Sequence, residues 1–308
     1  MIRSAPRVRR RYPPIERREA IDRETLERDY LSKNRPVVFT AGGEGFCDRW
    51  SPAALADRYG RCPVEAEETR EVYVGERAHV TRPLADLVTA ALEGDPTLRW
   101  KGLEFLKRVP GMQGDLDARP PPHRAHLPAS AGALRDTLWI APRATTSSLH
   151  HDGDYDNLNL QIAGRKLFLL LPPPLHEDLD SYGSAESPIN PFVPDLERFP
   201  RFEGLPAVEA TLAPGEVLLL PKYWWHCVYT VDPAVNLSTH FRWGGELSPW
   251  SVLAGAPIVH RSLTAIAAGM KRRGLHGIAD ATRRAWCAAY ARVVPRTTPQ
   301  ERCELVDA

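Results

Sequence analysis

The fold of this chain is decided by the stretch Thr145-Thr-Ser-Ser-Leu-His-His-Asp-Gly-Asp-Tyr-Asp-Asn-Leu-Asn-Leu-Gln-Ile-Ala-Gly-Arg-Lys166. His150 stands two places before Asp152, and residues two apart on an extended segment point to the same side. The pair can therefore hold one ion through a nitrogen and an oxygen. A third ligand must come from elsewhere. His226 is the best candidate, because it follows the apolar strand Val217–Leu220 and a Trp-Trp pair that would exclude water.

Two histidines and one carboxylate on one side of a metal leave its other coordination positions open. That arrangement suits non-haem Fe(II), which must also bind a cosubstrate and O2. His151 competes with His150 for the first place, but it is the weaker candidate because Gly153, two residues on, offers no carboxylate. The pattern predicts an oxygenase.

The stretch from about Leu138 to Gly245 resembles the JmjC and cupin-like Fe(II)/2-oxoglutarate oxygenases, in particular small protein hydroxylases such as the asparaginyl hydroxylase of hypoxia-inducible factor. The matching pieces are His150-x-Asp152, Asp156-Asn157, Gln161-x-x-Gly164-Arg-Lys166, Leu169-Leu-Leu-Pro-Pro173, Pro214-Gly-Glu-Val-Leu-Leu-Leu-Pro221 and Trp224-Trp-His226. Their order and spacing together are specific, whereas a lone His-x-Asp occurs by chance in many chains of this length.

The resemblance implies a mainly β fold with flanking helices, whose core is a double-stranded β-helix, the jelly-roll or cupin fold. It implies that His150, Asp152 and His226 hold Fe(II), with 2-oxoglutarate and O2 as cosubstrates. His240 is a further candidate for the third ligand, but His226 stands where the family's ligand stands.

Lys166 is the expected partner of 2-oxoglutarate. A lysine buried in a barrel is costly without an anion, whereas a surface lysine can extend its ammonium into water. We favour the buried alternative because Lys166 falls where the family's cosubstrate lysine falls. Ser147 falls where a hydroxyl residue often assists, and Asn157 is expected to help seat the same molecule.

Amides alternate with aliphatic residues along the strand that follows Asp152. Asn157, Asn159 and Gln161 occupy one face, and leucine and isoleucine occupy the other. We expect the amide face to carry the metal site, because the apolar face can pack against other elements. The segment between Asp152 and Asn157 is one residue longer than usual in the resembling proteins, which predicts a bulge.

A second alternating strand, 235–243, places Asn236, Ser238, His240 and Arg242 on one face. The resembling proteins commonly carry asparagine where His240 stands and an aromatic residue where Arg242 stands. We therefore expect these two residues to face the substrate and to change its polarity.

Four parts are predicted along the chain: a basic flexible tail (1–20), an N-terminal α/β part that braces the barrel (21–137), the catalytic core (138–246) and a C-terminal helical part (247–308). The N-terminal part should contain helices at 22–31 and 81–93, a helix beginning at Ser51-Pro52, a strand at 35–40 and a turn at Gly42–Gly45. The C-terminal helices would either pair two subunits or pack on their own barrel.

Two long segments are expected to have little regular structure. Residues 110–132 form a flexible connection or an ordered loop over the active-site mouth, and His123 and His126 within them are predicted to be solvated. Residues 175–207 are predicted to cross the substrate face, with their aromatic side chains packing the segment down.

Composition restricts the class of protein. The 308 residues carry a net charge of +1, and their five cysteines are scattered. Neither a strong field for nucleic acid nor a disulfide framework is indicated. No apolar run approaches the roughly 20 residues that span a bilayer, and the basic N-terminus lacks the apolar segment of a secretory signal. These features predict a cytoplasmic protein without membrane contact.

The preferred hypothesis is an Fe(II)/2-oxoglutarate-dependent dioxygenase that hydroxylates a protein or peptide side chain. The alternatives are a hydroxylase of a free amino acid or small metabolite, and a metal cupin without 2-oxoglutarate chemistry. An RNA base and a non-catalytic binding module are less favoured.

Overall fold

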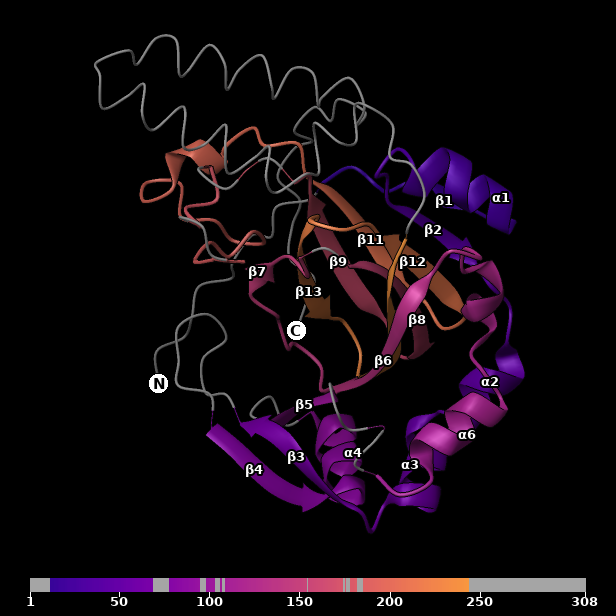
Figure 1. Ribbon diagram of the computed structural model, residues 1–308. Coiled ribbons are helices and arrows are strands. Elements are labelled where there is room, and N and C mark those ends of the chain that lie inside the picture. Colours follow the sequence, from indigo (N-terminus) through magenta and orange to yellow (C-terminus); the bar gives the residue numbers. More distant parts are fainter. Residues whose placement is uncertain are drawn as a thin grey trace, which may run out of the picture.

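The computed structural model describes residues 12–68, 78–94, 98–102, 106, 109–153, 155–173, 175, 178–181 and 185–243 (Figure 1). Two β-sheets form the core of this part. The larger sheet has the strand order β1 (Arg17–Arg18), β2 (Val37–Thr40), β12 (Glu216–Leu220), β8 (Asp156–Ala163), β14 (Ala234–Arg242), β6 (Gly132–Ala141), β5 (Leu98–Gly102), β3 (Pro63–Glu68) and β4 (Ala78–Pro83). The smaller sheet has the order β10 (Glu186–Ser187), β7 (Leu149–His150), β13 (Trp225–Thr230), β9 (Lys166–Leu171) and β11 (Val208–Leu212).

Apolar side chains from both sheets meet between them. Phe168 and Leu170 of β9 pack with Leu218 and Leu220 of β12 in one buried cluster. Antiparallel neighbours dominate both sheets, and the chain crosses between the sheets from β7 to β8 to β9 and again from β11 through β12 and β13 to β14, as in a jelly roll. The predicted cupin fold is confirmed.

Gly164 makes the tight connection from β8 to β9, and so from one sheet to the other. Its φ is +65°, and a Cβ atom at this position would lie 2.1 Å from the carbonyl oxygen of Pro233. Only glycine fits there without a shift of the backbone. The turn brings Lys166 to the beginning of β9.

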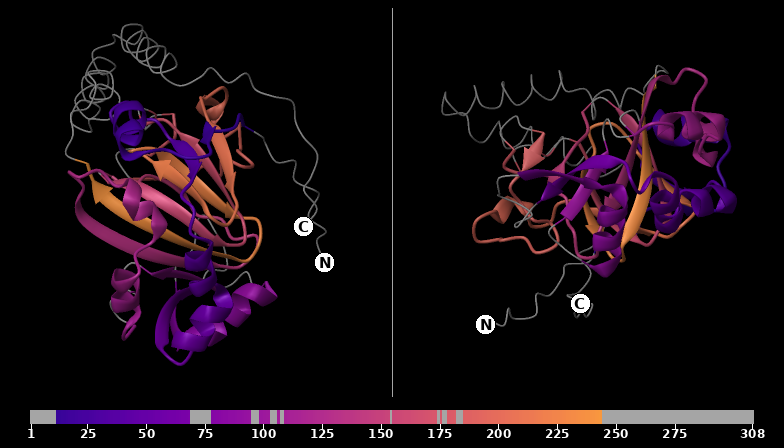
Figure 2. Two further views of the ribbon diagram at one scale, coloured as in Figure 1. Left: turned by 90° about the vertical axis from the view of Figure 1, so that its right-hand side faces the viewer. Right: turned by 90° about the horizontal axis from the view of Figure 1, so that it is seen from below.

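Helices cover the outer face of the larger sheet (Figure 2). They are α1 (Arg23–Thr25) with a π-helical continuation (Leu26–Leu31), α2 (Glu44–Arg49), α3 (Pro52–Tyr59), α4 (Leu84–Glu93) and α6 (Met112–Ala118). Leu158 and Leu160 of β8 share a buried cluster with Trp50 and Leu55. The aliphatic face of β8 therefore packs outward, as its alternation predicts.

Two predicted helix starts are confirmed. The Asp22 carboxylate accepts a hydrogen bond from the backbone N–H of Thr25 at 2.8 Å, and Ser51 caps α3 with Pro52 in its first turn. Each cap satisfies an N–H group that the helix itself cannot bond.

The first 20 residues are not a free tail from Tyr12 onward. Pro14 bridges Glu209 of β11, Ile15 is buried, and β1 pairs in parallel with β2. This N-terminal strap, residues 12–18, touches one edge of each sheet. The basic composition of the segment predicted a flexible tail. Composition does not reveal strand pairing, because the pairing uses backbone groups.

The N-terminal part and the core are joined more closely than predicted. The proposed boundary at 137/138 falls inside β6, and β2 pairs directly with β12. Both parts share one sheet.

Two local predictions need correction. The turn at Gly42–Gly45 passes into helix α2 at Glu44, and the helix expected from Thr81 begins at Leu84, because Thr81 lies in β4. On α4 itself, Ala91 is buried and Leu92 is 55% exposed.

The 110–132 segment is more ordered than predicted, with helix α6 followed by a 3-10 turn at Pro122–His126. His123 is not solvated but fully buried. Its Nε2 lies 2.6 Å from the hydroxyl of Thr239, and burial lowers its pKa to about 3. His126 is half-buried and packs edge-on against Phe39 with ring centroids 5.0 Å apart.

The 175–207 segment has little regular structure, as predicted. Phe192, Phe199 and Phe202 are buried in a cluster with Leu149 and Trp225 of the smaller sheet. The aromatic residues pack this segment down. Tyr182 and the predicted C-terminal helical part lie outside the described residues. No helix in the described ranges is long and apolar enough to cross a membrane.

Candidate active site

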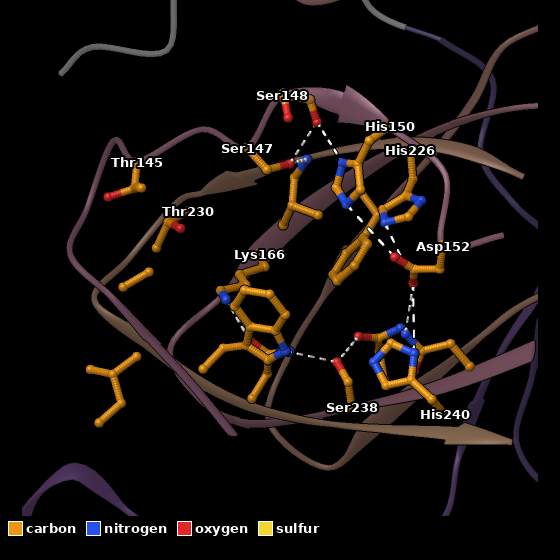
Figure 3. A pocket seen from close by; sticks show the side chains of 18 of the residues that line it. Thr145, Ser147, Ser148, His150, Asp152, Lys166, His226, Thr230, Ser238 and His240 are labelled. Atoms are coloured by element: carbon orange, nitrogen blue, oxygen red, sulfur yellow. Dashed lines mark hydrogen bonds and ion pairs between the residues drawn. The ribbon is translucent and has the colours of Figure 1, made fainter. Parts of the chain in front are cut away.

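Three predicted ligands meet between two strands of the smaller sheet. His150 ends β7 and pairs across the strands with His226 near the start of β13. Asp152 follows β7 in the adjoining loop. Ligand atoms of these three residues all lie within 4.8 Å of one another, which suits a single metal ion (Figure 3).

Backbone carbonyls orient both histidines. Nδ1 of His150 lies 2.8 Å from the carbonyl oxygen of Ser148, and Nδ1 of His226 lies 3.1 Å from that of Trp224. A carbonyl can only accept, so each Nδ1 carries a proton, and the neutral ring offers its Nε2 to a metal. The Nε2 atoms lie 3.8 and 4.0 Å from the Asp152 carboxylate.

The groups around the Asp152 carboxylate keep it ionised. Burial raises its pKa, but His226, His150, His240 and a hydrogen bond from the Asn157 amide at 3.3 Å outweigh that effect and hold the pKa well below its usual range. Burial lowers the pKa of His226. The donor set is therefore two imidazoles and one ionised carboxylate, the set preferred by non-haem Fe(II).

The competing histidines do not join this group. His240 reaches from β14 in the opposite sheet, with Nδ1 3.8 Å from the Asp152 carboxylate, and it lies outside the set of converging ligand atoms. His151 packs edge-on against Trp225 with ring centroids 4.7 Å apart. Its Nδ1 accepts a hydrogen bond from the backbone N–H of Gly153, so it braces the loop that carries Asp152.

A cavity of about 140 Å³ adjoins the three ligands (Figure 3). Its polar lining comes from both sheets and comprises Thr145, Ser147, Ser148, His150, Asp152, Asn157, Asn159, Lys166, Glu186, His226, Thr230, Asn236, Ser238 and His240. The amide face of β8 thus faces the site as predicted for Asn157 and Asn159, whereas Gln161 is buried beyond it and bonds backbone carbonyls.

The predicted cosubstrate residues lie at different places around this cavity. Lys166 is 5% exposed, and its ammonium donates a hydrogen bond to the side-chain carbonyl of Asn236. The Ser147 hydroxyl accepts from the backbone N–H of Val228 at 2.9 Å and lies 3.2 Å from a backbone carbonyl. Asn157 lies beside Asp152, so its amide supports the carboxylate directly.

Two amide side chains in the cavity wall each leave one polar atom without a hydrogen-bond partner among the described residues. These atoms are the side-chain carbonyl oxygen of Asn157 and the amide nitrogen of Asn159. Buried polar groups are nearly always satisfied by protein, water or ligand. The cavity is therefore suited to a polar ligand rather than an apolar one.

Arg242 does not line the cavity. The register of β14 shifts between His240 and Arg242, and the Arg242 side chain is exposed with its guanidinium 4.6 Å from the centre of the Tyr155 ring. The alternation that predicted a cavity-facing residue is broken by this irregularity.

Other lining residues were missed by sequence reasoning. Glu186 reaches the cavity because β10 pairs with β7 beside His150. So short a strand cannot be predicted from a local sequence pattern. Asn236 lay on a predicted polar face, but its role as the partner of Lys166 depends on two strands meeting in space.

The fold and the site define the class of protein. The family described as Cupin-like domain matches residues 23–243, and the chain belongs to this family. JmjC domain-containing proteins are among its relatives.

Individual relatives share parts of the chain. HSPB1-associated protein 1 of Homo sapiens is 40% identical over 103 residues, covering 32% of this chain and 21% of that protein. The Homo sapiens bifunctional peptidase and (3S)-lysyl hydroxylase JMJD7 is 26% identical over 241 residues, covering 65% and 75% respectively. Lysine-specific demethylase 8 of Xenopus tropicalis is 33% identical over 119 residues, covering 37% and 26%. The chain thus spans about a fifth of the length of HSPB1-associated protein 1.

Proposed function

We propose that this protein is an Fe(II)- and 2-oxoglutarate-dependent oxygenase that hydroxylates a side chain of a protein or peptide. One observation carries the proposal: two histidines and an ionised carboxylate converge beside a polar cavity that also contains a buried lysine. Its relatives include proteins named as a lysyl hydroxylase and a lysine-specific demethylase, which supports oxidation of protein side chains.

In this proposal His150, Asp152 and His226 hold the metal on one face. Bound iron would activate O2 at the expense of oxidative decarboxylation of 2-oxoglutarate. The two Nδ1–H···O=C bonds fix the imidazole planes, so little conformational freedom is lost on metal binding. Asn157 holds the Asp152 carboxylate in place by a hydrogen bond.

Lys166 would bind the distal carboxylate of 2-oxoglutarate. An ammonium in a buried site is stabilised by an anion, and the cavity extends from Lys166 to the three ligands (Figure 3). The amide nitrogen of Asn159, which has no partner among the described residues, could donate a hydrogen bond to an oxygen of that ligand.

Buried aromatic residues behind the site would limit the access of water. Trp224 and Trp225 are 1% and 0% exposed, and their ring nitrogens donate to the carbonyl oxygens of Asn34 and Pro173. These contacts fix the backbone on the N-terminal side of His226. A rigid, dry wall favours a single productive geometry.

The proposal is tested by measuring aerobic succinate formation from 2-oxoglutarate with Fe(II). The wild type should form succinate, Asp152→Ala should reduce it to background, and Asp117→Ala should leave it unchanged because that carboxylate is exposed on helix α6 and lies outside the cavity lining. A screen of peptides, free amino acids and metabolites for the mass gain of one oxygen then distinguishes the two substrate classes. A folded, iron-loaded protein that neither binds 2-oxoglutarate nor forms succinate would refute the proposal.

A further inference from the structure

Two arginines share one aromatic ring beside the cavity. The guanidinium carbon of Arg135 lies 5.3 Å from the centre of the Tyr155 ring, and that of Arg242 lies 4.6 Å from it. The Tyr155 ring in turn meets His240 edge-on, with centroids 6.5 Å apart. A continuous path leads from buried His240 through half-buried Tyr155 to the two exposed arginines.

Strand register places this path on the cavity side of the larger sheet. Arg135 of β6 pairs with His240 of β14, and Trp139 of the same strand pairs with Asn236. Directly paired residues point to the same face, and Trp139, Asn236 and His240 all line the cavity. Arg135 therefore continues that lining outward. The register shift after His240 brings Arg242 to the same ring from the neighbouring strand.

The two positive charges have a clear electrostatic consequence. Both guanidinium carbons lie over one ring, so their separation cannot exceed the sum of the two centroid distances. Two cations this close give the rim of the cavity a local positive potential, which attracts a carboxylate and allows charge-assisted hydrogen bonds to it. Contact with the ring restricts both arginine side chains in advance, which reduces the entropy lost on binding.

The opposite side of the cavity carries the opposite charge. Glu186, on β10 beside His150, lines the cavity and is exposed. An acidic substrate group would be repelled there and attracted to the arginine pair. The charges therefore favour one orientation of an acidic ligand across the site, with its acidic group on the side of the arginine pair.

We propose that Arg135 and Arg242, held by Tyr155, bind an aspartate or glutamate side chain of the peptide substrate. This inference rests on the proposed hydroxylation of a peptide. The distances from His240 to the ring and from the ring to the guanidinium groups add up to the span of a short extended segment. At about 3.3 Å per residue, the acidic residue would lie roughly three to four positions from the oxidised one.

The test is a binding measurement that needs neither iron nor turnover. The fluorescent peptides share one neutral sequence. Each carries a single glutamate or a single glutamine, which is moved by one position from peptide to peptide, and the affinities are measured by fluorescence anisotropy. The glutamate peptide should bind wild type about tenfold more tightly at low salt, and this preference should decline as salt screens the charges. Arg135→Gln and Arg242→Gln should each abolish most of the preference.

Matched variants make the result specific. Arg198→Gln removes an exposed arginine that also stacks on an aromatic ring, Phe199, outside the cavity lining, and should leave the preference intact. Tyr155→Phe should keep it because the ring remains, whereas Tyr155→Leu should reduce it. Equal binding of the two peptides by wild type, or an equal loss in Arg198→Gln, would overturn the inference. So would tighter binding of a single-stranded oligonucleotide, which would assign the arginines to phosphate.

The two proposals fail in different ways. Normal succinate formation with no preference for glutamate would remove only the acidic-substrate inference. Glutamate preference without 2-oxoglutarate binding would show that the arginine pair recognises carboxylates while the oxygenase proposal is wrong.

Discussion

Replacing Asn157 by alanine should weaken metal binding without unfolding the protein. The Asn157 amide donates a hydrogen bond of 3.3 Å to the Asp152 carboxylate, whose side chain is 23% exposed. Hydrogen bonds to charged groups contribute about 1.5–3 kcal/mol, and this one is long, so the low end applies. A loss of about 1.5 kcal/mol corresponds to roughly tenfold weaker binding, within the range seen when outer partners of metal ligands are removed.

The neighbouring amide provides the control. Asn159 is as deeply buried as Asn157 and lies on the same face of β8, but it accepts a hydrogen bond from Ser238 instead of contacting Asp152. Asn159→Ala should therefore cause a similar loss of stability with wild-type metal affinity. Anaerobic calorimetry with Fe(II) measures both affinities, and thermal unfolding of the metal-free variants compares their stabilities.

Two results would refute this reasoning. Wild-type affinity in Asn157→Ala would show that the hydrogen bond does not position the carboxylate. An equal fall in both variants would show that general loosening of β8 is responsible. If Asn157 only seats 2-oxoglutarate, its substitution would weaken 2-oxoglutarate binding to the iron-loaded protein and leave iron affinity unchanged.

Three further predictions concern the cosubstrate, the turn and the buried histidine. Lys166→Met should abolish measurable 2-oxoglutarate binding in calorimetry while thermal stability stays level or rises, because a buried charge is removed. Gly164→Ala should lower the free energy of unfolding by at least about 2 kcal/mol in urea titrations, because it adds a contact with Pro233 to the cost of a positive φ. Gly204→Ala has a similar φ of +77° but open space around it, so it should cost only about 1 kcal/mol. Burial lowers the pKa of His123 to about 3, whereas an unfolded histidine titrates near about 6.5. Between these values the unfolded chain binds the extra proton, so the free energy of unfolding should fall as the pH decreases, by up to about 1.4 kcal/mol per pH unit. His123→Gln should lack this contribution in urea titrations across the same pH range; an unchanged slope would contradict the assignment.

The parts of the fold that could be predicted are those in which local pattern and long-range motif agree. The alternation of β8 identified both its faces, and the spacing of His150 and Asp152 identified two members of the candidate centre. His226 was accessible because an apolar strand and a tryptophan pair precede it. In each case the information lies within a few residues of the side chain concerned.

The parts that could not be predicted depend on distant contacts or on one residue of register. His123 lies in a proline-rich segment that resembles a solvated loop, and its burial arises from contact with Thr239, far along the chain. Arg242 follows the alternation of β14, yet a register shift turns it out of the cavity. The pairing of Arg135 with His240 depends on which strands become neighbours, which local sequence does not specify.

The N-terminal strap also protects the fold against self-association. Without residues 12–18, β2 would become an outer strand of the larger sheet, and β11 would lose its bridge to Pro14. Each strand would then present unpaired N–H and C=O groups, which readily recruit a strand from another molecule. A chain shortened to begin at Ile21 should therefore precipitate or form strand-exchanged oligomers even though its candidate metal ligands are intact.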